Sequence, residues 1–339
     1  MDTNALRGGG YGPAPSATLL RGLAWETGHR LSLPQEVVDE RLASFEREVA
    51  PLIGAGDVGR LLDIVPSWHG RAAAARDFED APLPSVASAK AAHYQSLTER
   101  PSTRFLILPT PPRAADEGVS REKSRRRPAT QSGHEARDVV VWLTALEAAK
   151  SQRQSNVYFV SADKTYCGDR ADRLHPDLAA EAPRNLRFFR SVDALINRLS
   201  CPAVPRDGLA DSPEVIAAIE QTALYGDSDP NHDLRRDLWD WAPDGVSFSR
   251  IASARPALVK ERGIRSRRCG STMFTAIDAV YRLDLEYNEE GAGTTAVTVR
   301  LGVLVTEDEG DPLGVRVLAR AGIKAHGSEE DLEATHGTE

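Results

Sequence analysis

Apolar residues near the start of the chain recur at the spacing of an amphipathic helix. Within residues 31–53 they fall three or four positions apart along one helical face. The positions are Val37, Val38, Leu42, Phe45 and Val49. Pro34 lies at the beginning of the pattern, where a proline is tolerated because its missing N–H would have no helical partner. The pattern therefore predicts a helix over 31–53.

Short apolar runs then alternate with helical patterns. The runs predict strands at 104–109, 156–163 and 185–190. The helical patterns predict helices at 137–152 and 191–200. Ser191 is a natural N-cap for the second of these helices. Strands that alternate with helices are typical of a parallel α/β sheet, which we predict for this part of the chain.

The pattern changes after residue 204. One further helix is predicted at 212–224, followed by an acidic, proline-containing linker at 226–246. Runs near 274–287 and 294–306 alternate between apolar and polar residues, as in antiparallel strands with one solvated face. These features predict an acidic α+β domain over 204–325, made mostly of antiparallel strands. The Gly/Glu/His-rich tail, 326–339, is expected to be disordered.

Composition and charge limit the number of domains and the kinds of protein that this chain can be. A length of 339 residues favours two domains. Residues 1–200 carry 27 Lys+Arg against 25 Asp+Glu, and residues 201–339 carry 15 against 25, so the acidity lies in the second part. The three cysteines show no zinc-binding spacing. Neither a signal peptide nor a run of roughly 18 apolar residues is present, so we predict a cytoplasmic protein without a membrane partner.

Four carboxylates occupy positions that suggest a shared site. Asp138 opens a predicted buried helix, Asp163 follows a predicted strand, and Glu40 lies in the first amphipathic helix. Asp2 would join them if a strand preceded it. In an open α/β sheet, ligands gather at the carboxyl ends of the strands. Converging carboxylates repel one another, and a divalent cation such as Mg²⁺ or Mn²⁺ removes that repulsion.

Each acid also has a simpler reading. Asp138 could merely favour a helix N-terminus, Glu40 could be a solvated surface residue, and Asp163 could be a turn residue. The joint arrangement, rather than any single acid, indicates a metal site. Such a site can activate water against a phosphodiester.

Four motifs in order carry a family resemblance. They are "DTNAL" at 2–6, "LPQEVVDE" at 33–40, "EARDVVVWLTAL" at 135–146 and "VYFVSADKTY" at 157–166, with "LHPDL" at 174–178 nearby. In this order they resemble a PIN domain over about residues 1–200, with the fold of toxin-type nucleases. The resemblance implies a three-layer α/β/α domain with a parallel sheet over residues 1–203. The nearest likeness is to a PIN-like group whose function is unknown.

The resemblance implies an activity and a set of site residues. Many PIN domains are Mg²⁺- or Mn²⁺-dependent ribonucleases, so an RNA endonuclease is expected here. By matched position, Asp2, Glu40, Asp138 and Asp163 would be the catalytic, metal-binding acids. Asn4 would brace the first loop, and Ser161 would support the last acid or bind a ligand. A non-cutting module that binds RNA or protein, and a DNA- or flap-directed nuclease, are the alternatives. A toxin role is not favoured for a chain of this length.

Residues 111–134 form a polar stretch, predicted to be an exposed loop or a mobile helix. It contains the basic run "REKSRRR" at 121–127. The residues that could grip RNA phosphates are Lys123, Arg125, Arg126 and Arg127, although a solvated charge run is the commoner meaning of such a pattern. A second basic cluster, "ERGIRSRRC" at 261–269, could touch RNA or offset nearby acids. The acidic domain could bind a regulatory protein or mediate homo-oligomerisation.

The first residues depart from the family pattern. In PIN domains an apolar strand of about five residues runs into the first aspartate, whereas here Asp2 follows Met1 directly. We expect the true chain to begin upstream of this start. A real truncation is the alternative, and it would leave Asp2 poorly ordered and weaken metal binding.

Overall fold

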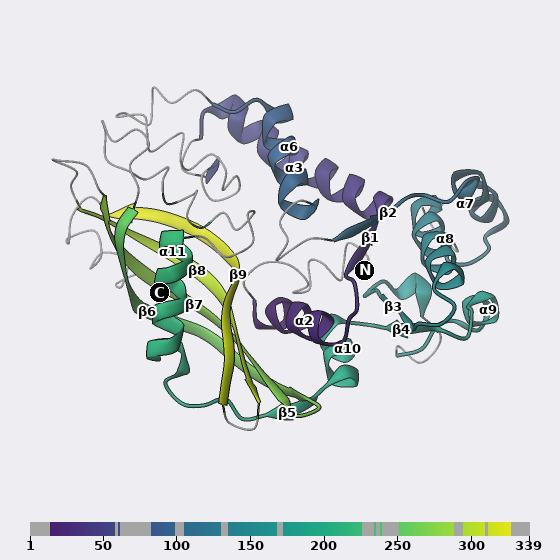
Figure 1. Ribbon diagram of the computed structural model, residues 1–339. Helices are drawn as coiled ribbons and strands as arrows, with labels where there is room; N and C mark the ends of the chain where they lie inside the picture. Colours follow the sequence, from purple (N-terminus) through teal and green to yellow (C-terminus); the bar gives the residue numbers. More distant parts are fainter. Residues whose placement is uncertain are drawn as a thin grey trace. The chain divides into compact units, whose positions relative to one another are not determined.

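The computed structural model places helices and strands in two compact units (Figure 1). It describes residues 14–57, 60–61, 83–98, 105–129, 135–167, 172–225, 234, 238, 251–287, 294–308 and 311–326. The first unit takes its described residues from Leu23–Ser44 and Phe105–Cys201. The second takes its own from Gly12–Gly22, Phe45–Arg104 and Pro202–Glu339. Asp2, Asn4 and the predicted tail from residue 327 lie outside the described residues.

The first unit combines helices with parallel strands, as the sequence predicts. Its elements are β1 (Ser32–Pro34), α3 (Gln35–Ala55, as far as Ser44), β2 (Leu106–Leu108), α7 (Ala114–Ser124), α8 (Ala136–Ser151), β3 (Val157–Val160), the 3₁₀ turn η3 (Lys164–Tyr166), α9 (Pro176–Glu181), β4 (Leu186–Phe189) and α10 (Val192–Leu199). Strands β1 and β2 pair in parallel, and so do β3 and β4. The described strands thus form two parallel pairs.

A hydrophobic core surrounds helix α8. Val141 and Trp142 of this helix are buried with Phe159 of β3, Tyr166 of η3 and Leu178 of α9. The consecutive residues 139–142 of helix α8 are all apolar and buried, so this helix is covered on several faces. Burial of this kind fixes the first turn of α8, which carries Asp138, against strand β3 and turn η3.

The polar stretch at 111–134 contains helix α7, so the structure favours the helix over the exposed loop of the two predicted alternatives, and part of this helix is buried. Helix α7 buries Ala114, Gly118 and Arg121. A Cβ atom added to Gly118 would lie 2.8 Å from the backbone oxygen of Ala136, so glycine lets α7 approach the start of α8 closely. Small residues and one paired arginine form this buried face, so no apolar periodicity reveals it in the sequence.

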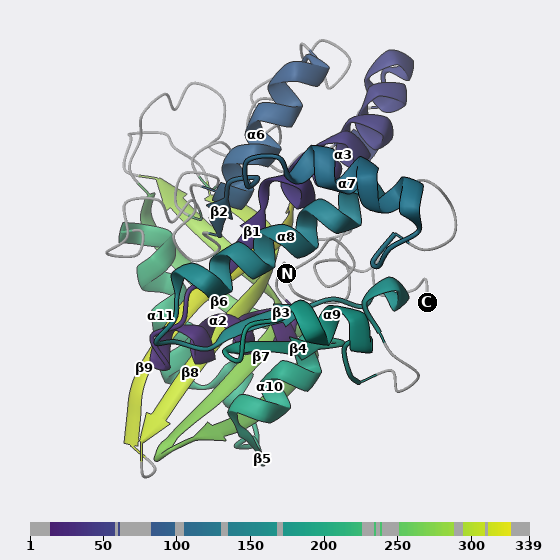
Figure 2. The same ribbon diagram turned by 90° about the vertical axis from the view of Figure 1, so that its right-hand side faces the viewer.

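The second unit contains the antiparallel sheet predicted for the C-terminal part. Strands β6 (Ile251–Cys269), β7 (Thr272–Tyr287), β8 (Thr294–Asp308) and β9 (Asp311–His326) follow one another in antiparallel order and lie side by side in both views (Figures 1 and 2). The short strand β5 (Cys201–Ala203) forms the other edge of this five-stranded sheet. The basic segment 261–269 is part of β6.

Helix α11 (Pro213–Tyr225) covers one face of this sheet. Its residues Val215 and Ile219 join a core with Tyr281 and Leu283 of β7. The hydroxyl of Tyr281 donates to the backbone oxygen of Ala210 in the 3₁₀ turn η4 (Leu209–Asp211), at 2.9 Å. Apolar residues of β7 and β8 alternate because only one face packs against this core.

The remaining described helices are α2 (Pro15–Glu26) and α6 (Val86–Thr98). In the second unit, a Cβ on Gly22 of α2 would lie 2.7 Å from Leu304 of β8, so α2 approaches the sheet closely there. His93 of α6 stacks on Phe45 of α3, with ring centroids 4.2 Å apart. Among the described helices, none is long and apolar enough to cross a membrane.

Candidate functional site

Three of the four predicted acids are described, and all three lie in the first unit. Asp138 is the third residue of α8, and Asp163 follows β3 by three residues and caps η3. Glu40 lies in the second turn of α3. The fourth, Asp2, and the bracing residue Asn4 lie outside the described residues.

Asp138 is the electrostatically unusual member of this group. Burial, together with the negative charges of Asp163, Glu135 and Glu40, raises the pKa of Asp138 from 3.8 to about 7, and the neighbouring Arg137 only partly offsets this. Burial is the largest of these causes. A carboxylate with so high a pKa is poorly compensated when charged. It therefore gains from a cation, and such strongly shifted groups concentrate at functional sites.

Backbone and hydroxyl hydrogen bonds fix Asp163. Its Oδ1 accepts the N–H of Thr165 at 2.8 Å, and its own N–H donates to Oγ of Ser161 at 3.0 Å. Ser161 is fully buried. The simple reading of Asp163 as a turn residue is thus correct as far as it goes, because it caps η3. The cap also fixes the direction of its carboxylate, whose negative charge helps to raise the pKa of Asp138, and the buried hydroxyl of Ser161 holds the Asp163 backbone.

Glu40 has a cationic partner. Its Oε1 lies 3.2 Å from Nη1 of Arg137, the residue immediately before Asp138. This ion pair joins α3 to the start of α8, and the negative charge of Glu40 contributes to the raised pKa of Asp138. The pair also competes with any cation for the Glu40 carboxylate. Sequence spacing does not reveal it, because the two residues are 97 positions apart in the chain.

The three acids match a divalent metal in donor chemistry. Carboxylate oxygens are the ligands that Mg²⁺ and Mn²⁺ prefer, and the negative charges that help to raise the pKa of Asp138 would attract a cation. Within the described residues, however, no three Asp, Glu, His or Cys side chains lie close enough together to hold a metal ion. The four-acid metal site predicted from the sequence therefore stays a prediction, with Asp2 beyond the described part.

Two further side chains contact these acids or their elements: Tyr166, which the sequence did not single out, and Arg127, which it suggested only for RNA binding. The hydroxyl of Tyr166 donates to the backbone oxygen of Asp138 at 2.9 Å. Nη1 of Arg127 donates to the backbone oxygen of Thr165 at 3.0 Å. Tyr166 is only 1% exposed, and a buried tyrosine hydroxyl needs a partner. A tyrosine three residues after Asp163 was the only signal in the sequence.

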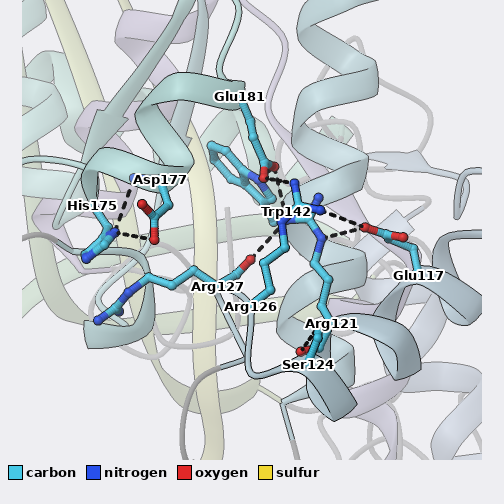
Figure 3. A network of polar contacts seen from close by, with 9 residues as sticks. All are labelled: Glu117, Arg121, Ser124, Arg126, Arg127, Trp142, His175, Asp177 and Glu181. Atoms are coloured by element: carbon cyan, nitrogen blue, oxygen red, sulfur yellow. Dashed lines mark hydrogen bonds and ion pairs between the residues drawn. The ribbon is translucent and has the colours of Figure 1, made fainter.

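Part of the basic run makes internal contacts rather than facing solvent alone (Figure 3). Arg121 is buried, and its guanidinium contacts Oε1 of Glu117 at 2.8 Å and Oε2 of Glu181 at 3.0 Å. Arg126 donates to Oε1 of Glu181 at 2.9 Å. Nε1 of Trp142 donates to Oε2 of Glu181 at 3.2 Å. Burial disfavours the charged Glu181, but these donors outweigh it and lower its pKa.

The four residues proposed to bind RNA therefore differ in their surroundings. Arg126 and Arg127 have partners within the first unit, whereas the side chains of Lys123 and Arg125 are exposed. Arg125 ends α7 in the left-handed conformation, with φ of 51°. RNA binding by this run stays a prediction. Nearby, His175 caps α9 by accepting the N–H of Asp177 at 3.3 Å.

Comparison with known proteins identifies the class of the first part of the chain. Residues 1–166 match the family model of the PIN domain. Searches of curated proteins and of solved structures each returned no match. The N-terminal part of this chain is thus a PIN domain, a fold whose members are generally nucleases and typically use divalent metals.

Proposed function

We propose that the protein is a metal-dependent endoribonuclease that hydrolyses RNA phosphodiesters. The observation that carries the proposal is the burial of the Asp138 carboxyl group and its raised pKa. Its carboxylate is buried at the start of α8 among the negative charges of Asp163, Glu135 and Glu40, which raises its pKa to about 7. Such an arrangement costs the empty fold stability, and strongly shifted carboxyl groups concentrate at functional sites, so it supports a cation-binding site.

Asp138 and Asp163, with Glu40 and Asp2, would hold Mg²⁺ or Mn²⁺. When bound, the ion would lower the pKa of a water molecule and stabilise the negative charge that develops on the phosphodiester. The chain's own part is to present carboxylates at fixed positions. Ser161 and the N–H of Thr165 orient Asp163. The hydroxyl of Tyr166 anchors the first turn of α8, which carries Asp138.

The proposal is tested by incubating the protein with a mixed pool of single-stranded RNA. We expect cleavage with Mn²⁺ or Mg²⁺ and none with EDTA. A matched pool of single-stranded DNA distinguishes RNA from DNA as the substrate. Cleavage of the DNA pool alone would contradict the ribonuclease proposal and favour a DNA-directed nuclease. Cleavage that persists in EDTA would exclude the metal-dependent mechanism.

A module that binds RNA without cutting it is the second candidate. The specific observation in its favour is that two of the acids already have partners within the protein. Arg137 lies 3.2 Å from Glu40, and the N–H of Thr165 donates to Asp163. Mn²⁺ or RNA binding without cleavage of any pool would favour this reading over the enzyme.

Replacing Arg137 by glutamine tests whether Glu40 belongs to the metal site. The change removes a cation beside Asp138 and frees Glu40 from its ion pair. A half-exposed ion pair contributes about 1 kcal/mol or less. We therefore expect Arg137→Gln to bind Mn²⁺ up to about five-fold more tightly at low salt, as measured by titration calorimetry.

The matched control is Arg173→Gln, which removes an exposed arginine from the same unit. It should leave the Mn²⁺ affinity close to that of the wild type. Weaker Mn²⁺ binding by Arg137→Gln would instead show that the Arg137–Glu40 pair organises the site rather than competing with the ion.

A further inference from the structure

We propose that turn η3 (Lys164–Tyr166) sets the spacing of Asp138 and Asp163, and that Arg127 is a positioning residue that holds this turn. The inference rests on the proposed function, because the spacing matters for a metal shared by the two acids. It gives part of the basic run a role different from gripping RNA phosphates.

Turn η3 holds Asp163 directly. The N–H of Thr165 donates to Oδ1 of Asp163 at 2.8 Å, so the first residues of the turn set the direction of this carboxylate. Sγ of Cys167, just after the turn, lies 3.4 Å from the backbone oxygen of Asp163. The side chain and the backbone of Asp163 are therefore both tied to η3 and its end.

The same turn reaches Asp138. Tyr166 is the last residue of η3, and its hydroxyl donates to the backbone oxygen of Asp138 at 2.9 Å. Its ring is fixed by the core, with centroids 5.1 Å from Phe159 and 6.4 Å from Trp142. One three-residue turn thus contacts both acids, although they lie 25 positions apart in the sequence.

Arg127 fixes the turn from the other side. Its Nη1 donates to the backbone oxygen of Thr165 at 3.0 Å, and its own backbone oxygen accepts Nη1 of Arg121 at 3.0 Å. Arg121 is 5% exposed and paired with Glu117 and Glu181, so it forms a rigid base (Figure 3). A continuous chain of contacts therefore runs from Arg121 through Arg127 and Thr165 to Asp163.

The test compares Tyr166→Phe, Arg127→Gln and Lys123→Gln in the full chain. Tyr166→Phe removes one hydroxyl and keeps the packed ring. Lys123→Gln matches Arg127→Gln in charge within the same basic run. The measurements are Mn²⁺ affinity by titration calorimetry, amide hydrogen exchange of peptides covering 164–166 without metal, and kcat and KM on the RNA pool. Circular dichroism checks that each variant is folded.

Residues that orient metal ligands typically change affinity or activity by about 10- to 100-fold when altered. We therefore expect Tyr166→Phe and Arg127→Gln to bind Mn²⁺ about 10-fold more weakly and to lose kcat more than KM. Exchange at Thr165 should become faster in Arg127→Gln. Lys123→Gln should keep the Mn²⁺ affinity and exchange rate of the wild type.

Two results would overturn the proposal. One is unchanged exchange and unchanged Mn²⁺ affinity in both positioning variants. The other is an equal rise in KM for Arg127→Gln and Lys123→Gln with exchange unaltered, because that identifies phosphate contacts. If the wild type binds no Mn²⁺, the proposed function fails separately. Exchange at Thr165 then decides alone: faster exchange in Arg127→Gln supports the positioning role, and equal exchange refutes it.

Discussion

Substituting asparagine for Asp138 is expected to lower metal-dependent RNA cleavage by about two to four orders of magnitude. A metal ion contributes several kcal/mol to charge stabilisation in such reactions, and each 1.36 kcal/mol corresponds to about ten-fold in rate. Asparagine keeps the shape of the side chain and removes the charge that would bind the cation. The measurement is the initial rate of cleavage of the RNA pool with saturating Mn²⁺.

Asp116→Asn is the matched control for this experiment. Asp116 is the third residue of α7, as Asp138 is the third residue of α8, but it is exposed. Both changes remove an acid from the first turn of a helix, so they share any loss of favourable interaction with the helix dipole. Asp116→Asn should cleave RNA like the wild type. Equal turnover by Asp138→Asn and the wild type would remove Asp138 from the site.

Local patterns predicted most of the regular structure. Ser191 caps α10 as expected, with its Oγ accepting the N–H of Ala194 at 3.0 Å. The run at 274–287 lies within β7, because alternation with one buried face is a property of a single strand. Such signals depend on residues a few positions apart, so they can be read without knowledge of the fold.

Helix α7 shows why other parts could not be predicted. Its buried face includes Arg121, a residue type that is mostly exposed, and Gly118, which has no apolar side chain to mark the face in the sequence. Arg121 is buried because Glu181, 60 positions away, pairs with it. The pairing of charges over such distances is a consequence of the fold, and so the run at 121–127 reads as a solvated segment.

In the candidate site, too, some features are visible in the sequence and others only in the fold. Asp138, Asp163 and Glu40 could be chosen because their order and their places beside element ends are visible in the chain. Their surroundings could not: Tyr166 reaches Asp138, and Arg137 reaches Glu40, only after the helices have packed. The resemblance to a PIN domain thus suggested the acids as a candidate site, whereas the structure supplies the contacts made by Asp138 and Glu40.

The raised pKa of Asp138 predicts an unusual dependence of stability on pH in the metal-free protein. Asp138 loses its proton near 3.8 when unfolded and near 7 when folded. Between these values the folded state binds more protons, so a rise in pH favours unfolding. The stability associated with Asp138 is fully present below about pH 4 and is lost as pH rises toward 7. A shift of about three pKa units corresponds to about 4 kcal/mol as an upper bound.

Asp138→Asn should remove this penalty, because the amide carries no charge at any of these pH values. With EDTA present, we expect its free energy of unfolding in urea to exceed that of the wild type by about 2–4 kcal/mol at pH 8. The difference should disappear near pH 4, and Asp116→Asn should show no such trend. A difference that is constant across the pH range would mean that Asp138 ionises normally in the fold.

Saturating Mn²⁺ should stabilise the wild type more than Asp138→Asn, since only the wild type retains the charged ligand. The wild type should then become the more stable of the two proteins at pH 8. An acid that weakens the empty fold and strengthens the metal-bound one is retained for the metal rather than for the fold.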